Sequence, residues 1–156
     1  MKLFICILII LSSPSIAFSD DNSPWGEAKE ANSSYKPQKV LYDVTTENEK
    51  TIIEILDRIS YLNNIYGNDP FDSSIVVVLH GPSIPFFTKA KFEKYRNTIT
   101  RAQSLTVGST IEFRMCQTSA KLQGFEPKDI HGFIRMVPMA DAEIIQLQKE
   151  GYAYMR

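Results

Sequence analysis

The sequence predicts an α/β protein with a mostly parallel, five-stranded sheet covered by helices on both faces. Strand-type and helix-type patterns alternate along residues 39–156 as βαβαβαβαβ, an order that right-handed crossovers convert into a parallel sheet. The segment Ser74–Leu79 (SIVVVL) is an apolar run, which is typical of a central strand covered on both faces. Residues 39–156 are also enough for one domain of ordinary size.

The start of the chain has the features of a secretory signal peptide. A lysine precedes the apolar run 3–11, and small residues lead to Ala17 and Ser19, a pattern that signal peptidase recognises. The apolar run is shorter than the roughly 20 residues that a membrane-spanning helix needs. We therefore expect a signal peptide at 1–19 with cleavage after Ser19, and a periplasmic or secreted protein that no membrane anchor retains.

A polar segment separates this leader from the domain. Residues 20–38 (DDNSPWGEAKEANSSYKPQ) contain two prolines and no apolar period, which predicts a flexible N-terminal arm. The folded domain is therefore expected at 39–156.

The charge balance excludes two classes of partner. The chain has 17 basic and 18 acidic residues and a net charge of −1. A protein without a basic excess lacks the electrostatic signature of nucleic-acid binding or of binding to an anionic membrane. We expect neither partner.

The first strand and helix follow the arm. Lys39–Val44 (KVLYDV) is a short β-rich run. Thr46 and Glu49 together form a capping-box pattern, which predicts a helix that starts at Thr46 and ends near Gly67. Its apolar spacing predicts one buried face, made of Ile52, Ile55, Leu56, Ile59 and Leu62.

The second strand is Ser74–Leu79, and His80-Gly81-Pro82 ends it. A second helix is expected to begin near Thr88. Its buried side is predicted to contain Phe92, Tyr95, Ile99, Ala102 and Leu105. Its other side carries basic residues that we interpret as a solvated face: Lys89, Lys91, Lys94, Arg96 and Arg101.

The remaining elements are shorter. Strands are predicted at 110–115, 133–137 and 152–156, with a short helix at Gln117–Leu122 and a longer one at 140–150. Glycines 124 and 151 are placed as the helix stops. The longer helix is expected to bury Ile144, Ile145 and Leu147, and His131 is expected to be solvated in a polar loop.

Three polar segments are predicted to meet at the carboxyl edge of the sheet, where ligands of parallel α/β folds gather. They are Thr45-Thr46, His80-Gly81-Pro82 and Cys116-Gln117-Thr118. Beyond the chemistry of Cys116 and His80, this placement makes four residues candidates for ligand binding: Gly81, Pro82, Gln117 and Thr118.

Cys116 is the candidate nucleophile. Cys6 leaves with the leader, so Cys116 is the only cysteine of the mature chain, and an unpaired thiol is unusual in an exported protein. A position at a helix N-terminus favours the thiolate, and Arg114, two residues back on the same strand face, is a candidate to add positive charge. The alternative is a buried, inert cysteine that acts as a small hydrophobe.

His80 is a candidate base or charge partner for Cys116; the alternative is a hydrogen-bonded structural histidine. Two histidines and one cysteine, far apart in sequence, do not form a zinc signature. No serine nucleophile elbow or Walker-type loop is present. A flavin is not expected either, because the loop at 44–49 has no glycine and places carboxylates where a phosphate would bind. We therefore expect no metal and no cofactor.

Several segments of residues 39–156 follow one another in a recognisable order. A hydrophobic strand runs into His80-Gly81-Pro82, a helix leads to the strand that ends in Cys116, and Gly124 and the stretch Pro127-Lys128-Asp129-Ile130 come next. The tail LQKEGYAY, residues 147–154, completes the order. In these segments the chain resembles the DsrE/DsrF-like family, in particular its exported members.

The resemblance implies a flavodoxin-like three-layer α/β sandwich that assembles into trimers or hexamers. In cytoplasmic sulfur-relay members, a cysteine after this strand carries sulfur as a persulfide and passes it to a partner protein, and Cys116 matches its position. Some relatives have a second cysteine three residues on, where this chain has Ser119.

These observations lead to one main hypothesis and two alternatives. The main hypothesis is an exported sulfur carrier, a possible sulfurtransferase, that finishes its chemistry on a second thiol from a partner. The first alternative is a non-catalytic, oligomeric module that binds a small ligand, with Cys116 structural. The second is a thiol-based redox sensor.

Overall fold

The computed structural model describes residues 24–156, so the predicted signal peptide at 1–19 and its cleavage point lie outside the described residues. The chain divides into two units, Met1–Ser33 and Ser34–Arg156. The described part of the first unit is exposed and contains a turn but no helix or strand. Residues 34–38 of the second unit also lack regular structure, and flexibility of the arm stays a prediction.

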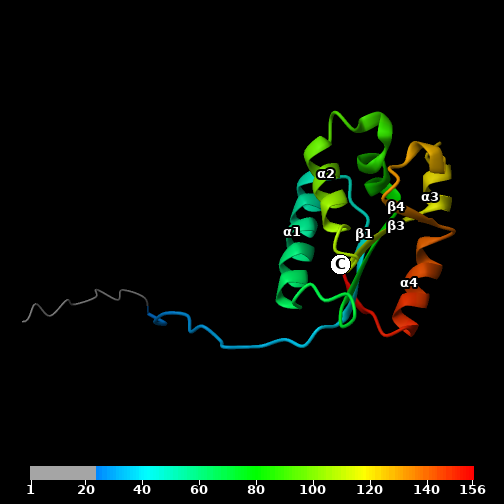
Figure 1. The fold of residues 1–156 in the computed structure, drawn as a ribbon. Helices are drawn as coiled ribbons and strands as arrows, with labels where there is room; N and C mark the ends of the chain where they lie inside the picture. The colour runs from blue at the N-terminus through cyan, green and yellow to red at the C-terminus, as the bar shows by residue number, and fades with distance from the viewer. Residues whose placement is uncertain (1–23) are drawn as a thin grey trace, which may run out of the picture. The chain divides into compact units, whose positions relative to one another are not determined.

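The five predicted strands form one parallel sheet in the described part of the chain (Figure 1). The strand order is β4-β3-β2-β1-β5, and each pairing is parallel. The α/β fold with a five-stranded sheet is therefore confirmed. The strand bounds are β1 Lys39–Val44, β2 Ser74–Leu79, β3 Ile111–Cys116, β4 Ile134–Val137 and β5 Ala153–Met155.

Helices cover both faces of this sheet, which gives the predicted three layers. In Figure 1, α1 (Glu49–Ile65) and α2 (Arg96–Leu105) lie on one side of the sheet and α4 (Ala140–Lys149) lies on the other. The short α3 (Gln117–Leu122) follows β3 directly. The placement of α3 and the start of α4 beyond the strand ends builds the edge where the candidate site lies.

Alternation along the strands divides the core into a large and a small cluster. On β1, Val40, Tyr42 and Val44 join the large cluster with α1 and α2. Leu41 points to the other face and packs in the small cluster, whose buried members are Leu41, Val76, Val78, Cys116, Ala140 and Leu147. The central strand β2 contributes to both clusters, as its apolar sequence predicts. Cys116 thus lies on the sheet face that carries the small core cluster.

The start of α1 differs from the predicted capping box. The helix begins at Glu49, and its N-cap is Asn48 rather than Thr46. The Asn48 side-chain oxygen accepts from the Lys50 N–H at 2.9 Å, and Thr46 Oγ1 accepts from the Asn48 N–H at 3.1 Å. Asparagine is at least as good an N-cap as threonine, so a suitable cap two residues later overrides the pattern. The predicted buried face of α1 is otherwise confirmed, with Leu62 half-buried.

The second helix begins at Arg96, so the prediction of a start near Thr88 is wrong. The preceding chain forms two 3-10 helices, η1 (Gly81–Phe87) and η2 (Lys89–Lys91). Prolines at 82 and 85 have no N–H to donate to an α-helix. Thr88 is extended and bridges to Ile130, which separates the two short helices.

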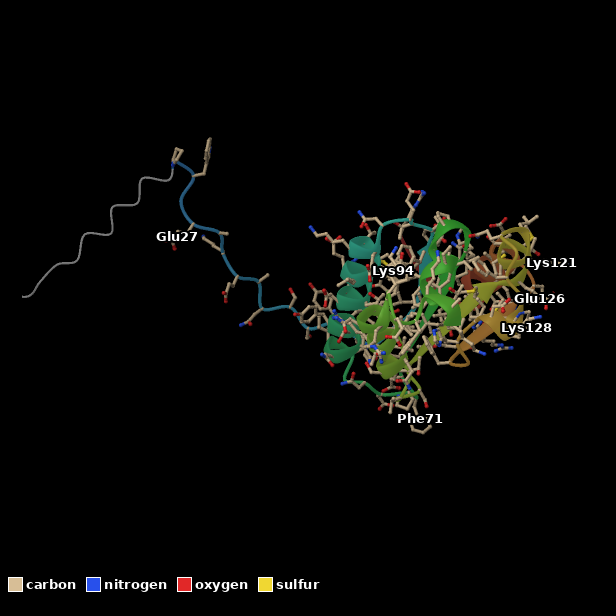
Figure 2. The ribbon with its side chains drawn as sticks, turned by 90° about the horizontal axis from the view of Figure 1, so that it is seen from above. Glu27, Phe71, Lys94, Lys121, Glu126 and Lys128 are labelled. Atoms are coloured by element: carbon tan, nitrogen blue, oxygen red, sulfur yellow. The ribbon has the colours of Figure 1, made fainter. Side chains whose placement is uncertain are left out.

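The residues predicted for the buried side and for the basic side of the second helix lie largely as expected. Tyr95, Ile99 and Ala102 are buried, and Phe92 and Leu105 are half-buried. The basic residues are exposed except for Arg101, which is half-buried and forms an ion pair with Asp57 on α1. Lys94, Lys121, Glu126 and Lys128 are all exposed, and Figure 2 labels them.

One predicted core residue of α4 is exposed. Leu147 is buried and Ile144 is half-buried, but 54% of Ile145 is exposed. Ile144 and Leu147 are three residues apart and share a helix face, whereas the next residue in a helix points about 100° away. The inward placement of Ile145 is therefore wrong.

His131 is packed among aromatic rings rather than solvated. Its ring centroid lies 5.5 Å from that of Phe92 and 6.2 Å from that of Phe133. Its Nε2 atom is buried and has no hydrogen-bond partner within residues 24–156. Burial lowers the pKa of His131, and the nearby Lys89 charge lowers it further, while a hydrogen bond with the Thr88 backbone opposes them.

This lowered pKa predicts a pH-dependent loss of stability that His131→Phe should reduce. The folded protein binds a proton at His131 less readily than the unfolded chain, whose histidine pKa is about 6.5. The contribution of neutral His131 to the free energy of unfolding is therefore fully present above this pH. It decreases as the pH falls through and below about 6.5. Urea unfolding at neutral pH and at about pH 5.5 should show a smaller loss for the variant, and equal losses in the two proteins would contradict this.

Candidate functional site: a thiol pocket at the carboxyl edge of the sheet

Cys116 and His80 lie together at the carboxyl edge of the sheet. Leu79 of β2 pairs with Met115 of β3. The residues that follow them, His80 and Cys116, therefore lie at the same edge and on the same face of the sheet. Both side chains line one pocket of about 180 Å³. The pocket is bounded by residues of two strand ends and two helices: His80, Cys116, Thr118, Ser119, Leu122, Met139, Ala140 and Asp141.

Cys116 ends β3 and caps α3. Its backbone is extended, and its Sγ accepts a hydrogen bond from the Ser119 N–H at 3.3 Å. Only 4% of the residue is exposed, although it lines the pocket. A backbone N–H aimed at sulfur stabilises a thiolate more than a thiol, because hydrogen bonds to an ionised acceptor are stronger. The predicted position of Cys116 at a helix start is confirmed by this contact.

Gly81 connects the two sides of the pocket through its backbone. Its N–H donates to Ser119 Oγ at 2.9 Å, and its carbonyl accepts from Gln123 Nε2 at 2.8 Å. Gly81 has a φ of +56°, and a Cβ at this position would lie 2.8 Å from Thr45 Oγ1. Both its conformation and its space therefore require glycine. Its role in the structure is to hold Ser119, which in turn holds the Cys116 sulfur.

His80 is held by an acidic residue that the sequence pattern did not single out. Its Nε2 lies 2.6 Å from Asp43 Oδ1, and the Tyr154 hydroxyl donates to Asp43 Oδ2 at 2.5 Å. The hydrogen bond to Asp43 raises the pKa of Tyr154, and slight burial and the Asp43 charge act in the same direction. Strands β1 and β5 and the residue that follows β2 thus form a Tyr154–Asp43–His80 array.

The array fixes the orientation of His80. A carboxylate that accepts from Nε2–H leaves Nδ1 as the ring nitrogen that can accept a proton. Within residues 24–156 no hydrogen bond joins His80 to Cys116. The two side chains line one pocket without a hydrogen bond between them, so His80 is placed to act on a molecule that enters it.

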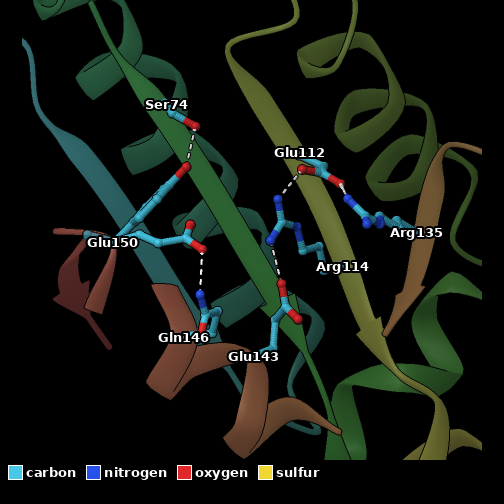
Figure 3. Close-up of polar contacts among 8 residues, drawn as sticks. Ser74, Glu112, Arg114, Arg135, Glu143, Gln146 and Glu150 are labelled. Atoms are coloured by element: carbon cyan, nitrogen blue, oxygen red, sulfur yellow. Dashed lines mark hydrogen bonds and ion pairs between the residues drawn. The ribbon is translucent and has the colours of Figure 1, made fainter. Parts of the chain in front are cut away.

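Arg114 lies between two carboxylates (Figure 3). Its Nη2 is 2.5 Å from Glu112 Oε2, and its Nη1 contacts Glu143 of α4. Burial works to lower the pKa of Arg114, but hydrogen bonds and charges from Glu112 and Glu143 outweigh it and raise the pKa overall. Arg114 does not line the thiol pocket. Its charge is therefore compensated by Glu112 and Glu143 and does not face the pocket that Cys116 lines.

The four predicted ligand-binding residues separate in space. Thr118 lines the thiol pocket, although its N–H and hydroxyl both donate to the Pro138 carbonyl. Gln117 lines a different cavity of about 150 Å³. Gly81 has an architectural position, and Pro82 is exposed outside the pocket.

The apolar and acidic wall of the pocket was not predicted from the sequence. Leu122, at the end of α3, and Met139 and Asp141, at the start of α4, line it. A signal existed for Asp43, because a carboxylate between buried Tyr42 and Val44 points to the opposite sheet face. Nothing local indicated Tyr154, because it depends on where β5 pairs.

The other described features give no second candidate for a thiol or metal site. A larger cavity of about 350 Å³ is lined by residues 88–90, 124–125 and 128–129 and contains no cysteine or histidine. Among residues 24–156, no three His, Cys, Asp or Glu side chains are grouped as they would be to hold a metal ion. No helix in this range is long and apolar enough to cross a membrane.

Comparisons with known proteins place the chain in a family. The model of the DsrE/DsrF-like family matches residues 39–156, the whole predicted domain. The chain belongs to the DsrE/DsrF-like family. Membership agrees with the order of segments from His80 to the tail, and with the parallel sheet described above.

A solved structure supports the fold of this DsrE-like chain. The protein of unknown function MTH1491 from Methanobacterium thermoautotrophicum matches with a TM-score of 0.61 and 17% sequence identity. The match covers 76% of this chain and 98% of that protein. At this identity the likeness shows the fold alone. A comparison with curated proteins found no match.

Proposed function

We propose that this DsrE-like protein carries sulfane sulfur on Cys116 as a persulfide. The observation that supports this most is the position of the Cys116 sulfur. It receives the Ser119 N–H at 3.3 Å and lines a cavity of about 180 Å³ that His80 also lines. The cavity provides room for a donor beside a sulfur that accepts a backbone hydrogen bond.

The proposed transfer has two balanced steps. In the first, the Cys116 thiolate attacks the outer sulfur of a sulfane-sulfur donor, a new S–S bond forms, and the donor's own bond to that sulfur breaks. The electron pair leaves with the remainder of the donor, and Cys116 becomes a persulfide. In the second, a thiolate from an acceptor attacks the outer sulfur and releases the Cys116 thiolate.

His80 is assigned to the departing group rather than to the thiol. Within the described residues no hydrogen bond connects its ring to Cys116, whereas Asp43 holds Nε2 at 2.6 Å. A protonated His80 can give a proton to the leaving group of the donor, which makes departure easier. Asp43 and Tyr154 are positioning residues, because they act through the ring of His80.

Exposure of the purified protein to inorganic polysulfide tests the proposal. Intact-mass and peptide spectrometry should show the addition of one or more sulfur atoms at Cys116, and Cys116→Ser should show none. Serine is a preferred N-cap, so the variant keeps a side-chain acceptor for the Ser119 N–H and should remain folded. A wild-type protein that gains no sulfur while its folded thiol stays unreactive would overturn the proposal.

One observation favours the alternative of a non-catalytic module. Cys116 is almost fully buried and already caps α3, which is sufficient reason for a cysteine to be present. In that case a small ligand would bind in the pocket with Cys116 structural, and Cys116→Ser would leave ligand binding intact at little cost in stability. The same labelling experiment separates the two functions.

The setting of the reaction is also part of the proposal. The acceptor thiol belongs to another molecule, because Cys116 is the free cysteine of the described chain. We further propose that the protein is exported to the periplasm or secreted after cleavage behind Ser19, and that it forms trimers or hexamers. Cell fractionation with N-terminal sequencing tests the first statement, and analytical ultracentrifugation tests the second.

A further inference from the structure

We infer that the thiol pocket selects sulfur compounds by charge: it accepts uncharged or positively charged ones and disfavours anionic ones such as thiosulfate, and Asp141 sets this preference. The inference rests on the proposed function for its biological meaning. Its physical basis is the charge distribution around Cys116, which can be measured separately.

The charged groups at the pocket are few. Asp141 and His80 are the ionisable side chains that line it besides Cys116, and no lysine or arginine does so within the described residues. Any positive charge on His80 is offset by Asp43, 2.6 Å away. The nearby Arg114 is occupied by Glu112 and Glu143. The pocket therefore has no net positive charge, whether or not His80 carries a proton, and Asp141 is the carboxylate that lines it directly.

Asp141 also counters an attraction for anions at this edge, the start of α4. The N-cap of α4 is Met139, which makes no side-chain hydrogen bond, and the helix start would attract anions through its partial positive charge. Asp141 lies in the first turn of α4 and offsets that attraction. Glu143 lies in the same turn, but it is engaged by Arg114.

The rim of the pocket is apolar. Leu122 is 84% exposed and Met139 is 47% exposed, so carbon groups of an incoming molecule would find apolar contacts there. A thiosulfate dianion would instead meet a carboxylate, an attacking thiolate and this apolar rim. The chemistry favours an uncharged organic polysulfide, or one whose organic group carries an ammonium.

Three methanethiosulfonate reagents measure the preference without any sulfane-sulfur transfer. The Cys116 thiolate attacks the alkyl-bearing sulfur, a disulfide forms, and methanesulfinate leaves with the electron pair. The methyl reagent is uncharged, the 2-sulfonatoethyl reagent is anionic and the 2-(trimethylammonio)ethyl reagent is cationic. Each rate is divided by that of 2-mercaptoethanol with the same reagent, which removes intrinsic differences in reactivity.

The anionic reagent should react about 10-fold more slowly than the uncharged one with the wild-type protein, on this normalised scale. Asp141→Asn should reduce this difference by about 3-fold or more, as expected for one partly screened charge close to the thiol. Asp141→Lys should reverse the order of the anionic and cationic reagents. Asp72→Asn is the matched control, because this exposed residue precedes β2 at the amino end of the strands.

The outcomes separate the inference from the function on which it rests. If Cys116 reacts with all three reagents without discrimination, or if Asp141→Asn behaves like Asp72→Asn, the charge preference is overturned and the persulfide proposal is unaffected. If the folded thiol reacts with none of them, both are overturned. The preference would also be overturned if thiosulfate transferred sulfur to wild-type Cys116 at the same rate as an uncharged trisulfide modifies this thiol.

Discussion

Phe113→Ala is expected to lower the free energy of unfolding by about 3–5 kcal/mol, the range for truncating a buried phenylalanine. The Phe113 side chain is fully buried in β3 and belongs to the large core cluster. Its ring centroid lies 6.3 Å from that of Phe87 and 5.9 Å from that of Phe133, the latter edge-on. Alanine would remove these contacts and leave a cavity that strands on both sides of β3 prevent from closing.

Urea unfolding followed by circular dichroism measures this loss. The control is Phe71→Ala, because Phe71 is 95% exposed and projects from the surface in Figure 2, so its loss should stay within about 0.5 kcal/mol. If the alanine variant does not fold, Phe113→Leu provides a milder change with an expected loss of about 1–2 kcal/mol. A loss below about 1 kcal/mol for Phe113→Ala would contradict the described core.

Gly81→Ala is expected to cost about 2–5 kcal/mol and to change the reactivity of Cys116. A side chain at the Gly81 φ of +56° costs about 1–2 kcal/mol, and the contact of its Cβ with Thr45 Oγ1 at 2.8 Å adds overpacking of about 1–3 kcal/mol. Movement of this residue would displace the Ser119 hydroxyl that accepts its N–H. Because Ser119 donates to the Cys116 sulfur, the thiol should respond.

Gly124→Ala separates the two causes. Gly124 has a φ of +82°, and a Cβ added there would have nothing within 4 Å, so this variant should show the backbone cost of about 1–2 kcal/mol alone. Adding Thr45→Ala to Gly81→Ala should recover the overpacking part but not the backbone part. Unfolding free energies and the rate of Cys116 alkylation measure both effects. Equal losses for Gly81→Ala and Gly124→Ala would show that the Thr45 contact has no energetic weight.

The local parts of the fold could be predicted from the sequence, and the reason is that they depend on neighbouring residues. β1 and β2 have the predicted bounds, because their apolar pattern and the turns beside them are read within a few positions. The start of α2 at Arg96 could not be placed, since Thr88 is held extended by a bridge to Ile130. Such a contact has no local signature.

The site was predictable in its location but not in its electrostatics. Strand ends placed His80 and Cys116 at one edge, as described. The compensation of Arg114 required Glu143, which lies 29 residues further along the chain on another element. Asp141 could not be assigned to the pocket either, because no sequence pattern fixes where the start of α4 lies relative to Cys116.

The pairing of β5 with β1 has a consequence for the order in which the molecule becomes competent. Tyr154 and Asp43, whose hydrogen bond completes the support of His80, are 111 residues apart in the sequence. Contacts of such separation form late, because closing a long loop costs entropy before its contacts are gained. Cys116 and His80 can therefore reach their places in a partly folded chain whose histidine is not yet oriented. The reactivity of the pocket would then reach its native value only when β5 has paired with β1. A thiol assay during refolding would therefore follow the docking of a strand at the far edge of the sheet.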